Sequence, residues 1–323
     1  ELTEGNMSAV SRVGSNSTLL TVRVLDTDKN QYLASGFSGR VWVTTNQVNF
    51  TIEANPSTSS TGYLNITYNP GCPYGIGPQW WIAGLVDNTT YKDTNSSNMN
   101  VTVNTDPLVA QLISPLNGQN FRRGKDIVPL IGNITDECGL VSGATAIMLS
   151  QQGTNNYDCS GETDAGNGNY SCNITASEHS SRPLGYYNTT LNATKSFYNV
   201  SNRARFLDAF QLATEPALTV PVATSDEATS TGGWGETWDF TYTVQDVDGD
   251  TVTVQLWADL GSGFQLLNQT SCPSCSSSNA STFTQTFNRT QIGSRVFKLN
   301  ATDTRNYTNE TSNTSFTIEK DDT

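Results

Sequence analysis

Short runs in which apolar residues occupy alternating positions recur along the chain and predict β-strands. Side chains on a strand point to its two faces in turn, so a period of two indicates a sheet with one buried face. In the first third of the chain these runs are TLLTVRVLD, GRVWVTT, VNFTIEAN, GYLNITYN, QWWIAGLVD and NVTVNT. Turn-forming clusters, DTDKN and NPSTSSTG, separate some of them. The pattern favours an all-β protein.

Alternation resumes after Asp106-Pro107, which marks a boundary because a proline cannot join a central ladder and holds the preceding residue extended. LVAQLISPLNGQNF, IVPLIGNITDECG, ATAIMLSQ and GYYNTTLNATKSFYNVS predict a second group of strands. The segment NRARFLDAFQLATEPAL has more helix formers, and we interpret it as a linker with room for one helical turn, or as the first strand of a third group.

The third group is the clearest. DFTYTVQ and TVTVQLWAD both alternate, and the DVDGD turn between them favours a hairpin. FTQTF, RVFKLNATD and SFTIEK supply later strands. An immunoglobulin-like domain takes about 100 residues, so we predict tandem immunoglobulin-like β-sandwich domains at 18–105, 106–213 and 214–323. Residues 1–17 form an extended segment before the first strand and are a candidate donor strand.

Composition narrows the function. Hydrophobic residues make up 35% of the chain and charged residues only 15%, and the formal net charge of −13 disfavours binding to nucleic acid or anionic lipid. We find no apolar run near the roughly 20 residues needed to span a bilayer, and no signal segment at the start. We therefore expect an extracellular chain at the cell surface with no direct membrane span of its own.

The acceptor pattern for N-linked glycans, Asn-x-Ser/Thr, is dense. Chance at this composition supplies roughly half of the matches, but several acceptor asparagines, such as Asn65 in LNITYN and Asn300 in FKLNATD, alternate with apolar neighbours and so fall on the solvent face of a predicted strand. We expect N-linked glycans there; the alternative is a polar β-protein whose sites stay unused. The candidate sites are Asn6, Asn16, Asn49, Asn65, Asn88, Asn95, Asn100, Asn133, Asn169, Asn173, Asn188, Asn192, Asn199, Asn268, Asn279, Asn288, Asn300, Asn306, Asn309 and Asn313.

Six cysteines, an even number, suit an oxidising exterior. Cys159 and Cys172 flank the loop SGETDAGNGNYS, and a disulfide across that predicted hairpin should contribute about 3 kcal/mol. Cys272 and Cys275 form a CxxC in a Ser-rich loop without a following helix, which favours a local staple over a redox site.

By elimination Cys72 and Cys138 remain, and their bond would tie the first domain to the second. The alternative is a bond to another subunit. Zinc is disfavoured, because the chain has one CxxC and one histidine.

Candidate chemistry is sparse. His179 lies alone in the loop ASEHSSRP, where we expect it to be exposed to solvent, and no nucleophile carries an adjacent signature. We therefore predict no catalytic residues and no enzyme; a glycosidase carboxylate pair needs a separation that sequence does not reveal. Asp246, Asp248 and Asp250 alternate like calcium ligands, but an EF-hand would require glycine and glutamate where Thr251 and Trp257 stand. A plain turn is our interpretation, with bound Ca²⁺ as the alternative and no other cofactor.

The tryptophans suggest carbohydrate binding as a second class of function, because exposed aromatic rings can stack on sugars. Trp80 and Trp81 are adjacent, so in a strand they face opposite sides and at most one is buried in a simple sandwich. The other would be covered by a neighbouring domain, subunit or ligand, and we favour neighbour packing over carbohydrate binding. Trp234 and Trp238 raise the same question.

The stretches SPLNG, NITDECG, GNGNYSC, DVDGDTVTVQLW and FTIEKDD give the chain a resemblance to archaeal cell-surface proteins with tandem immunoglobulin-like domains, including S-layer-like envelope proteins. The resemblance implies a structural subunit of an S-layer-like lattice or an extracellular filament, whose partners are copies of itself. The six cysteines favour a filament of disulfide-bonded subunits over a plain lattice. The rival is a surface adhesin or carbohydrate-binding module, and the third possibility is an envelope-associated hydrolase. Glycans would confine subunit contacts to stretches without acceptor sites, at about 202–267 and 101–132.

Overall fold

The computed structural model describes residues 2–105, 107–159, 161–199 and 203–320. Strands hold 56% of the chain and helices 2%, which confirms the all-β prediction. By its internal contacts the chain divides into two compact units, one of residues 1–115, 129–173 and 188–207, the other of 116–128, 174–187 and 208–323. The predicted domain boundaries therefore stay a prediction, and Asp106, which marks one of them, lies outside the described residues.

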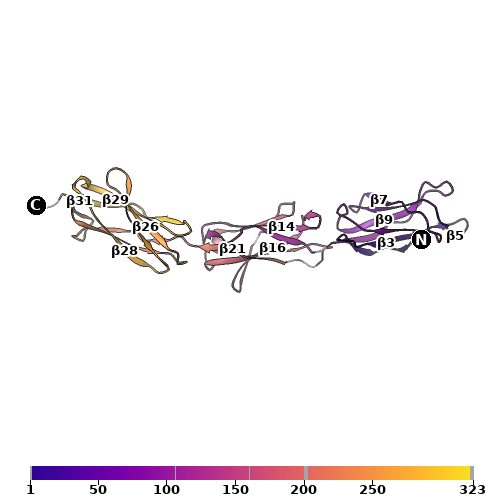
Figure 1. The fold of residues 1–323 in the computed structure, drawn as a ribbon, viewed down its shortest axis with the longest axis horizontal. Coiled ribbons are helices and arrows are strands. Elements are labelled where there is room, and N and C mark those ends of the chain that lie inside the picture. The colour runs from indigo at the N-terminus through magenta and orange to yellow at the C-terminus, as the bar shows by residue number, and fades with distance from the viewer. Residues whose placement is uncertain (1, 106, 160, 200–202, 321–323) are drawn as a thin grey trace. The chain divides into compact units, whose positions relative to one another are not determined.

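The strands pair into sheets within three successive parts of the chain, which we call the first (2–104), second (109–213) and third (217–319) sheet pair (Figure 1). In the first, one sheet has the order β1-β3-β8, with β1 at Leu2–Glu4, β3 at Thr18–Arg23 and β8 at Tyr63–Tyr68. The other has the order β2-β11-β9-β6-β7, with β2 at Ser8–Ser11, β11 at Met99–Asn104, β9 at Gly77–Leu85, β6 at Gly39–Thr44 and β7 at Phe50–Ala54. The short strands are β4 at Leu25–Asp26, β5 at Gln31–Tyr32 and β10 at Thr94–Asn95.

The second sheet pair repeats this plan. One sheet is β12-β14-β19-β18, with β12 at Val109–Ser114, β14 at Val128–Asp136, β19 at Asn169–Ile174, β18 at Thr163–Asp164 and, paired with β14, β15 at Gly139–Leu140. The other is β13-β21-β20-β16-β17, with β13 at Gln119–Arg122, β21 at Arg203–Ala213, β20 at Gly185–Thr194, β16 at Thr145–Gln152 and β17 at Asn155–Asp158. The helical turn α1 spans Ala176–His179.

The third sheet pair does so again. In one sheet, β25 at Thr237–Gln245 pairs with β22 at Ala217–Leu218, β23 at Val222–Thr224 and β28 at Asn279–Thr286. The other is β24-β31-β29-β26-β27, with β24 at Thr231–Gly233, β31 at Thr314–Glu319, β29 at Gly293–Thr302, β26 at Val252–Asp259, β27 at Phe264–Cys272 and, paired with β29, β30 at Thr308–Glu310. A short 3-10 helix, η1, spans Arg289–Gln291.

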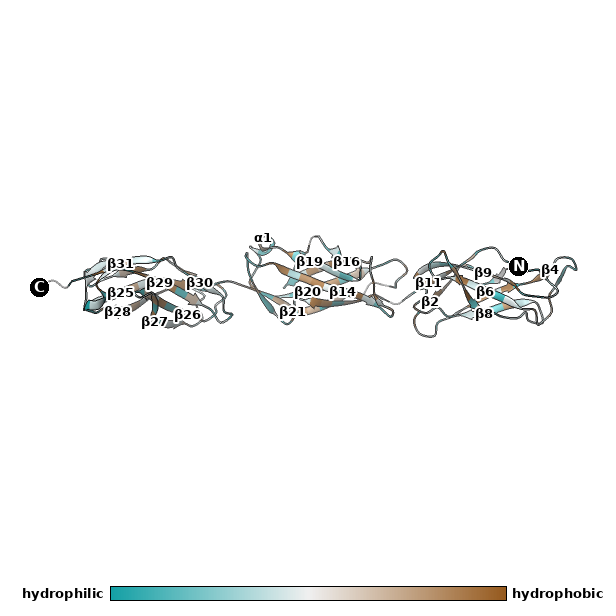
Figure 2. Ribbon diagram, turned by 90° about the horizontal axis from the view of Figure 1, so that it is seen from above, coloured by the Kyte–Doolittle hydropathy of each residue, from teal (hydrophilic) through white to brown (hydrophobic). Residues whose placement is uncertain are grey.

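Each core lies between the two sheets of a pair. In the first, Leu20 and Leu64 of one sheet pack in one buried cluster with Val41 and Trp81 of the other. In the third, Trp238 and Phe240 of β25 are buried together with residues of β26, β29 and β31. Hydrophobic and hydrophilic residues alternate along the strands in Figure 2, as the period of two predicts. Three such sandwiches in series confirm the tandem immunoglobulin-like prediction.

An edge segment that switches from one sheet to the other occurs in all three sheet pairs. Its first part pairs antiparallel within one sheet, and the chain then crosses to the other sheet and pairs parallel with the last long strand there. The parallel pairs are β2 with β11, β13 with β21, and β24 with β31. The crossover in the first pair lies at Gly5. Its positive φ of 96° favours glycine, and a Cβ there would also meet the Leu19 carbonyl oxygen at 2.7 Å.

The N-terminal segment differs from our expectation. Residues 1–17 are predicted to precede the first strand, yet β1 pairs with β3 and β2 pairs with β11 of the same sheet pair. Val10 is 4% exposed and belongs to the first core. The weak alternation of this segment concealed it, because the two short strands serve different sheets.

Two further expectations are wrong. DVDGD does not close a hairpin: β25 pairs with β22, β23 and β28, whereas β26 pairs with β27 and β29 in the other sheet, so the turn carries the chain across the sandwich. Most of the segment expected as a linker or first strand of the third group is β21, the last strand of the second sheet pair; its end, Ala217–Leu218, is β22, the first strand of the third, and the helical turn is at α1 instead. Burial between neighbours overrides the helix propensity of these residues.

Candidate functional site

The DVDGD turn after β25 forms an acidic loop, residues 246–250, whose backbone is fixed by the neighbouring disulfide loop. The Asp246 amide donates to the Cys275 carbonyl at 2.7 Å, and the Cys275 amide donates to the Asp250 carbonyl at 3.1 Å. Within the loop the Gly249 amide donates to the Asp246 carbonyl. Cys275 therefore holds both ends of the loop, and the Cys272–Cys275 disulfide closes the segment that does so.

Three carboxylates converge in this loop. Asp246, Asp248 and Asp250 each place one oxygen so that the three atoms lie within 4.8 Å of one another. Asp246 is fully buried; its Oδ1 accepts from the Asp248 amide, and its Oδ2 has no hydrogen-bond partner among the described residues. Asp303, after β29, is 5% exposed; its Oδ1 accepts from the Arg305 amide, and its Oδ2 is likewise unpartnered in the described part of the chain.

One arginine faces these acids. Arg305 forms ion pairs with Asp248, at 3.2 Å, and with Asp250. Asp248 also accepts from the Thr214 hydroxyl at 2.9 Å and from the Thr214 amide. Burial, followed by the adjacent Asp248, raises the pKa of Asp246. Burial also raises the pKa of Asp303, with the charge of Asp248 adding to it.

This donor set is typical of a hard cation. It consists of carboxylate oxygens, which Ca²⁺ prefers. Carbonyl groups and water commonly complete the six to eight oxygens that Ca²⁺ binds. The geometry thus keeps open the calcium alternative for Asp246, Asp248 and Asp250. The sequence missed Arg305 and the proximity of Asp303, because they lie over 50 residues further along the chain and only the pairing of β26 with β29 brings them near.

A second charged cluster lies at Arg12, which follows β2. Its guanidinium bonds to Asp136 at 2.6 Å and to Glu137 at 2.5 Å. Asp136 also accepts from the Tyr198 hydroxyl, and Glu137 from the Thr105 hydroxyl. The structure joins the adjacent Cys138 to Cys72, across a sequence separation of 66 residues.

The remaining predicted disulfide is present with a different role. The structure joins Cys159 to Cys172, and both are buried. Cys159 follows β17 of one sheet, whereas Cys172 lies in β19 of the other, so the bond joins the two sheets of the second pair instead of closing a hairpin. Sequence spacing selected the partners but not the topology.

His179 is not the exposed loop residue that we expected. It ends α1, is fully buried, and accepts from the Gly124 amide at 3.1 Å through Nδ1. Its Nε2 lies 2.7 Å from the Asp126 carbonyl oxygen. These two contacts connect α1 to the turn after β13.

The glycan acceptor sites lie in the described ranges, and each asparagine is half-buried or exposed. Eleven are exposed, including Asn65 and Asn268. Others are engaged: the Asn88 amide donates both to the Ser38 carbonyl and to the Val86 carbonyl, and the Asn309 amide donates to the Pro216 carbonyl. Ser201, which completes the Asn199 site, lies outside the described residues.

The tryptophan pair Trp80–Trp81 lies on β9. Trp81 is buried and Trp80 is 41% exposed, which confirms that only one of the two enters the core. Trp80 lies directly opposite the acceptor Asn100 across β9 and β11. In the third sheet pair Trp238 is buried and Trp234 is 36% exposed.

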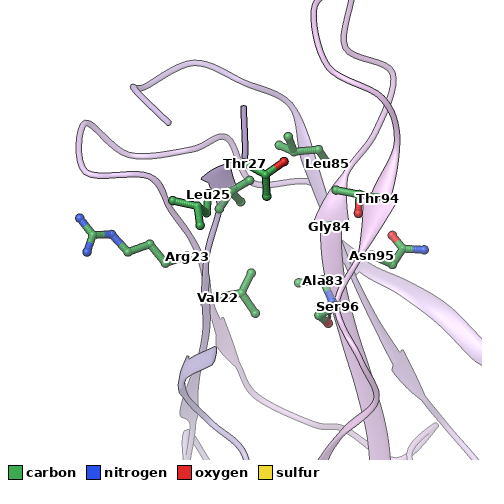
Figure 3. Close-up of a pocket in the computed structure, with 11 residues that line it drawn as sticks. Val22, Arg23, Leu25, Thr27, Ala83, Gly84, Leu85, Thr94, Asn95 and Ser96 are labelled. Atoms are coloured by element: carbon green, nitrogen blue, oxygen red, sulfur yellow. Dashed lines mark hydrogen bonds between the residues drawn. The ribbon is translucent and has the colours of Figure 1, made fainter. Parts of the chain in front are cut away.

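A hollow of about 320 Å³ opens between β3–β4 and β9–β10 in the first sheet pair (Figure 3). Val22 on one side faces Ala83 and Ser96 on the other, and Thr94 lies on the same side as Ala83. The side chain of Arg23 points away from it. Apart from Arg23, its lining residues are apolar or neutral, and the hollow supplies no acid, base or nucleophile pair for catalysis.

No protein-family model matches this sequence, and neither does any curated protein. Among solved structures, the D1–D4 ectodomain fragment of ICAM-5 is similar over 98% of this chain and 76% of its own length, with a TM-score of 0.53 and 14% identity. The Escherichia coli adhesin FdeC is similar over 98% of both chains, with a TM-score of 0.45 and 12% identity.

A tetra-tandem repeat from the extending region of a large adhesion protein is similar over 96% of this chain and 73% of its own, with a TM-score of 0.40 and 15% identity. At these identities the likeness concerns the fold, which is one of tandem immunoglobulin-like domains. In the described ranges, no helix has the length and hydrophobicity that a membrane crossing requires.

Proposed function

We propose that this chain is an extracellular structural glycoprotein. The observation that carries the proposal is the placement of the acceptor asparagines, each half-buried or exposed. Three disulfides support an oxidising exterior. Secretion from a glycosylating host and intact mass before and after removal of glycans tests it. We expect Asn65 to be occupied and Asn88 to stay bare, because modification at Asn88 breaks one of its two amide hydrogen bonds. A secreted chain with no added mass contradicts the proposal.

The finer proposal is self-association into a filament or an S-layer-like lattice. Glycans exclude neighbours, so contacts should fall in the stretches without acceptor sites. Of 21 exposed large hydrophobic residues in the described chain, ten lie in 101–132 or 202–267, which hold under a third of the sequence. Val222, 53% exposed, is among them in β23, which pairs with β25, and Val220, 69% exposed, precedes that strand.

Electron microscopy of the native material, compared with a Val222→Lys variant, tests self-association. A lysine on a sheet edge opposes edge-to-edge contact, so assemblies should be lost or shortened, whereas Val109→Lys, in the other stretch, serves as a second probe. Uniformly monomeric native material contradicts the proposal.

Donor-strand exchange is the most specific form of assembly. It now requires β1 and β2 to leave their own sheets and enter those of another copy, because the segment pairs within its own chain here. Deletion of residues 1–17 should then leave both sheets incomplete and abolish assembly. Assemblies that form normally without this segment contradict exchange.

A surface adhesin that binds carbohydrate is the second candidate, and the exposure of Trp80 and Trp234 favours it, since exposed aromatic rings stack on sugars. A glycan array with the deglycosylated chain tests it, with Trp80→Ala and Trp234→Ala as variants. Saturable binding that either variant abolishes supports the adhesin. Binding that neither changes points away from these rings.

We further propose that the chain has no enzymatic activity. The buried, hydrogen-bonded position of His179 supports this, because a general base must reach its substrate. Hydrolysis of chromogenic glycosides or esters above the rate of a His179→Gln variant would contradict it.

A further inference from the structure

We propose that the acidic loop forms a calcium site in which Arg305 takes the place of the cation when none is bound. Asp246, Asp248 and Asp250 supply the ligand oxygens, which lie within 4.8 Å of one another.

The first argument is that the cluster is electrostatically incomplete. Three carboxylates converge in the loop, and among the described residues the Arg305 guanidinium forms ion pairs with two of them, Asp248 and Asp250. The Oδ2 atoms of Asp246 and Asp303 are buried without a hydrogen-bond partner in the described residues. A buried, unpaired carboxylate oxygen is costly in general. A divalent cation held by Asp246, Asp248 and Asp250 supplies a partner for the Asp246 oxygen.

The second argument is that the loop is built and held in place. Its backbone is fixed at both ends by Cys275, so the carboxylates are held close despite their mutual repulsion. Asp248 is oriented separately by the hydroxyl and amide of Thr214. A cation site requires carboxylates that are held close by contacts from other residues, because their like charges would otherwise drive them apart.

Calcium fits better than magnesium or zinc. The donors are all oxygens, which disfavours zinc at a site with neither cysteine thiolate nor histidine in the described cluster. Mg²⁺ demands near-ideal octahedral geometry and releases its water reluctantly, whereas Ca²⁺ accepts irregular sets of six to eight oxygens. An extracellular calcium module typically binds at about 10⁻⁴ to 10⁻³ M.

The test is calorimetric titration of the whole chain with CaCl₂, together with thermal unfolding in CaCl₂ and in EDTA. We expect one saturable site, and a rise of roughly 5 °C in the calcium-sensitive transition at about 10 mM Ca²⁺. MgCl₂ should bind at least about tenfold more weakly. No saturable heat up to about 20 mM Ca²⁺, or equal binding of Mg²⁺, overturns the proposal.

Variants separate ligation from a purely structural role. Asp246→Asn should abolish the calcium response while leaving unfolding in EDTA unchanged or raised, because it removes a buried unpaired charge. The control Glu227→Gln makes the same charge change at an exposed carboxylate and should keep the full response. Equal responses in both variants overturn the proposal.

Arg305→Gln gives an independent test, because it leaves the three proposed calcium-coordinating side chains in place. It deletes the competing positive charge, so calcium should bind about tenfold more tightly than to the wild-type chain. Unchanged or weaker binding in this variant overturns the role given to Arg305, and with it the proposal as stated.

Discussion

Two clusters in this protein place an arginine among carboxylates beside a disulfide, and they end in opposite states. At Arg12 there are two acids, and all four carboxylate oxygens of Asp136 and Glu137 accept hydrogen bonds. Burial would raise the pKa of Glu137, but hydrogen bonds from Thr105 and Arg12 lower it on balance. At Arg305 three acids converge in the acidic loop, and burial raises the pKa of Asp246.

The difference shows which property makes an acidic cluster a candidate site. Each cluster contains an acid whose side chain is nearly fully buried, Asp136 in the first and Asp246 in the second, so burial of an acid alone does not distinguish them. The donors do: Tyr198 and Thr105 complete the first cluster, whereas the described residues leave Asp246 and Asp303 with unpartnered oxygens in the second. We therefore interpret the first cluster as structural, and the unpartnered oxygens of the second are the basis of the calcium proposal.

The largest expected effect is at Arg12. Arg12→Met keeps the side-chain volume but leaves the carboxylates of Asp136 and Glu137 without their counter-charge, and breaking a buried pair in this way costs about 3–5 kcal/mol. Urea unfolding monitored by tryptophan fluorescence measures the loss. Arg40→Met is the matched control, because Arg40 pairs with the largely exposed Asp87 and should cost under about 1 kcal/mol. Equal losses would break the comparison.

At Arg305 we expect a smaller loss that calcium repairs. In EDTA, Arg305→Gln should lower the free energy of unfolding by about 2 kcal/mol, less than at Arg12 because Arg305 is more exposed. With saturating CaCl₂ the variant should match the wild-type chain, because the ion takes over the neutralisation. The measurement is urea unfolding in both buffers. A loss that calcium leaves unchanged would make the two clusters equivalent.

Much of the fold follows from sequence, because the period of two is local. The alternation in β25 and β26 predicted two strands correctly, whereas their assignment to one hairpin was wrong, since a turn does not record which sheet the next strand joins. The N-terminal strands β1 and β2 escaped prediction because each is short and serves a different sheet.

The candidate site was only half visible for a related reason. Asp246, Asp248 and Asp250 stand in one loop and share a spacing that sequence displays. Arg305 and Asp303 come from the β29–β30 turn, and the burial that leaves an Asp246 oxygen unpartnered is a tertiary property. His179 was misplaced in the same way, because its burial depends on the distant turn at Gly124.

The disulfide loop gives a third, smaller effect. A Cys272→Ser, Cys275→Ser double variant opens the segment that holds the acidic loop through the Cys275 backbone. We expect calcium affinity to fall about tenfold, equivalent to about 1.4 kcal/mol, while the Cys159→Ser, Cys172→Ser variant leaves it unchanged. Calorimetric titration compares the two. Identical affinities would show that the acidic loop keeps its shape without the staple.

The smallest effect should come from Thr214, which orients one ligand without being one. Thr214→Val removes the hydroxyl that donates to Asp248 at 2.9 Å but keeps the amide that donates to the same carboxylate. Loss of one such bond costs about 1 kcal/mol, and calcium affinity should fall by no more than about fivefold. Thr282→Val, at an exposed position of β28, is the control and should change neither quantity. If Thr214→Val abolishes calcium binding, the threonine is itself a ligand, and the acidic loop alone does not define the site.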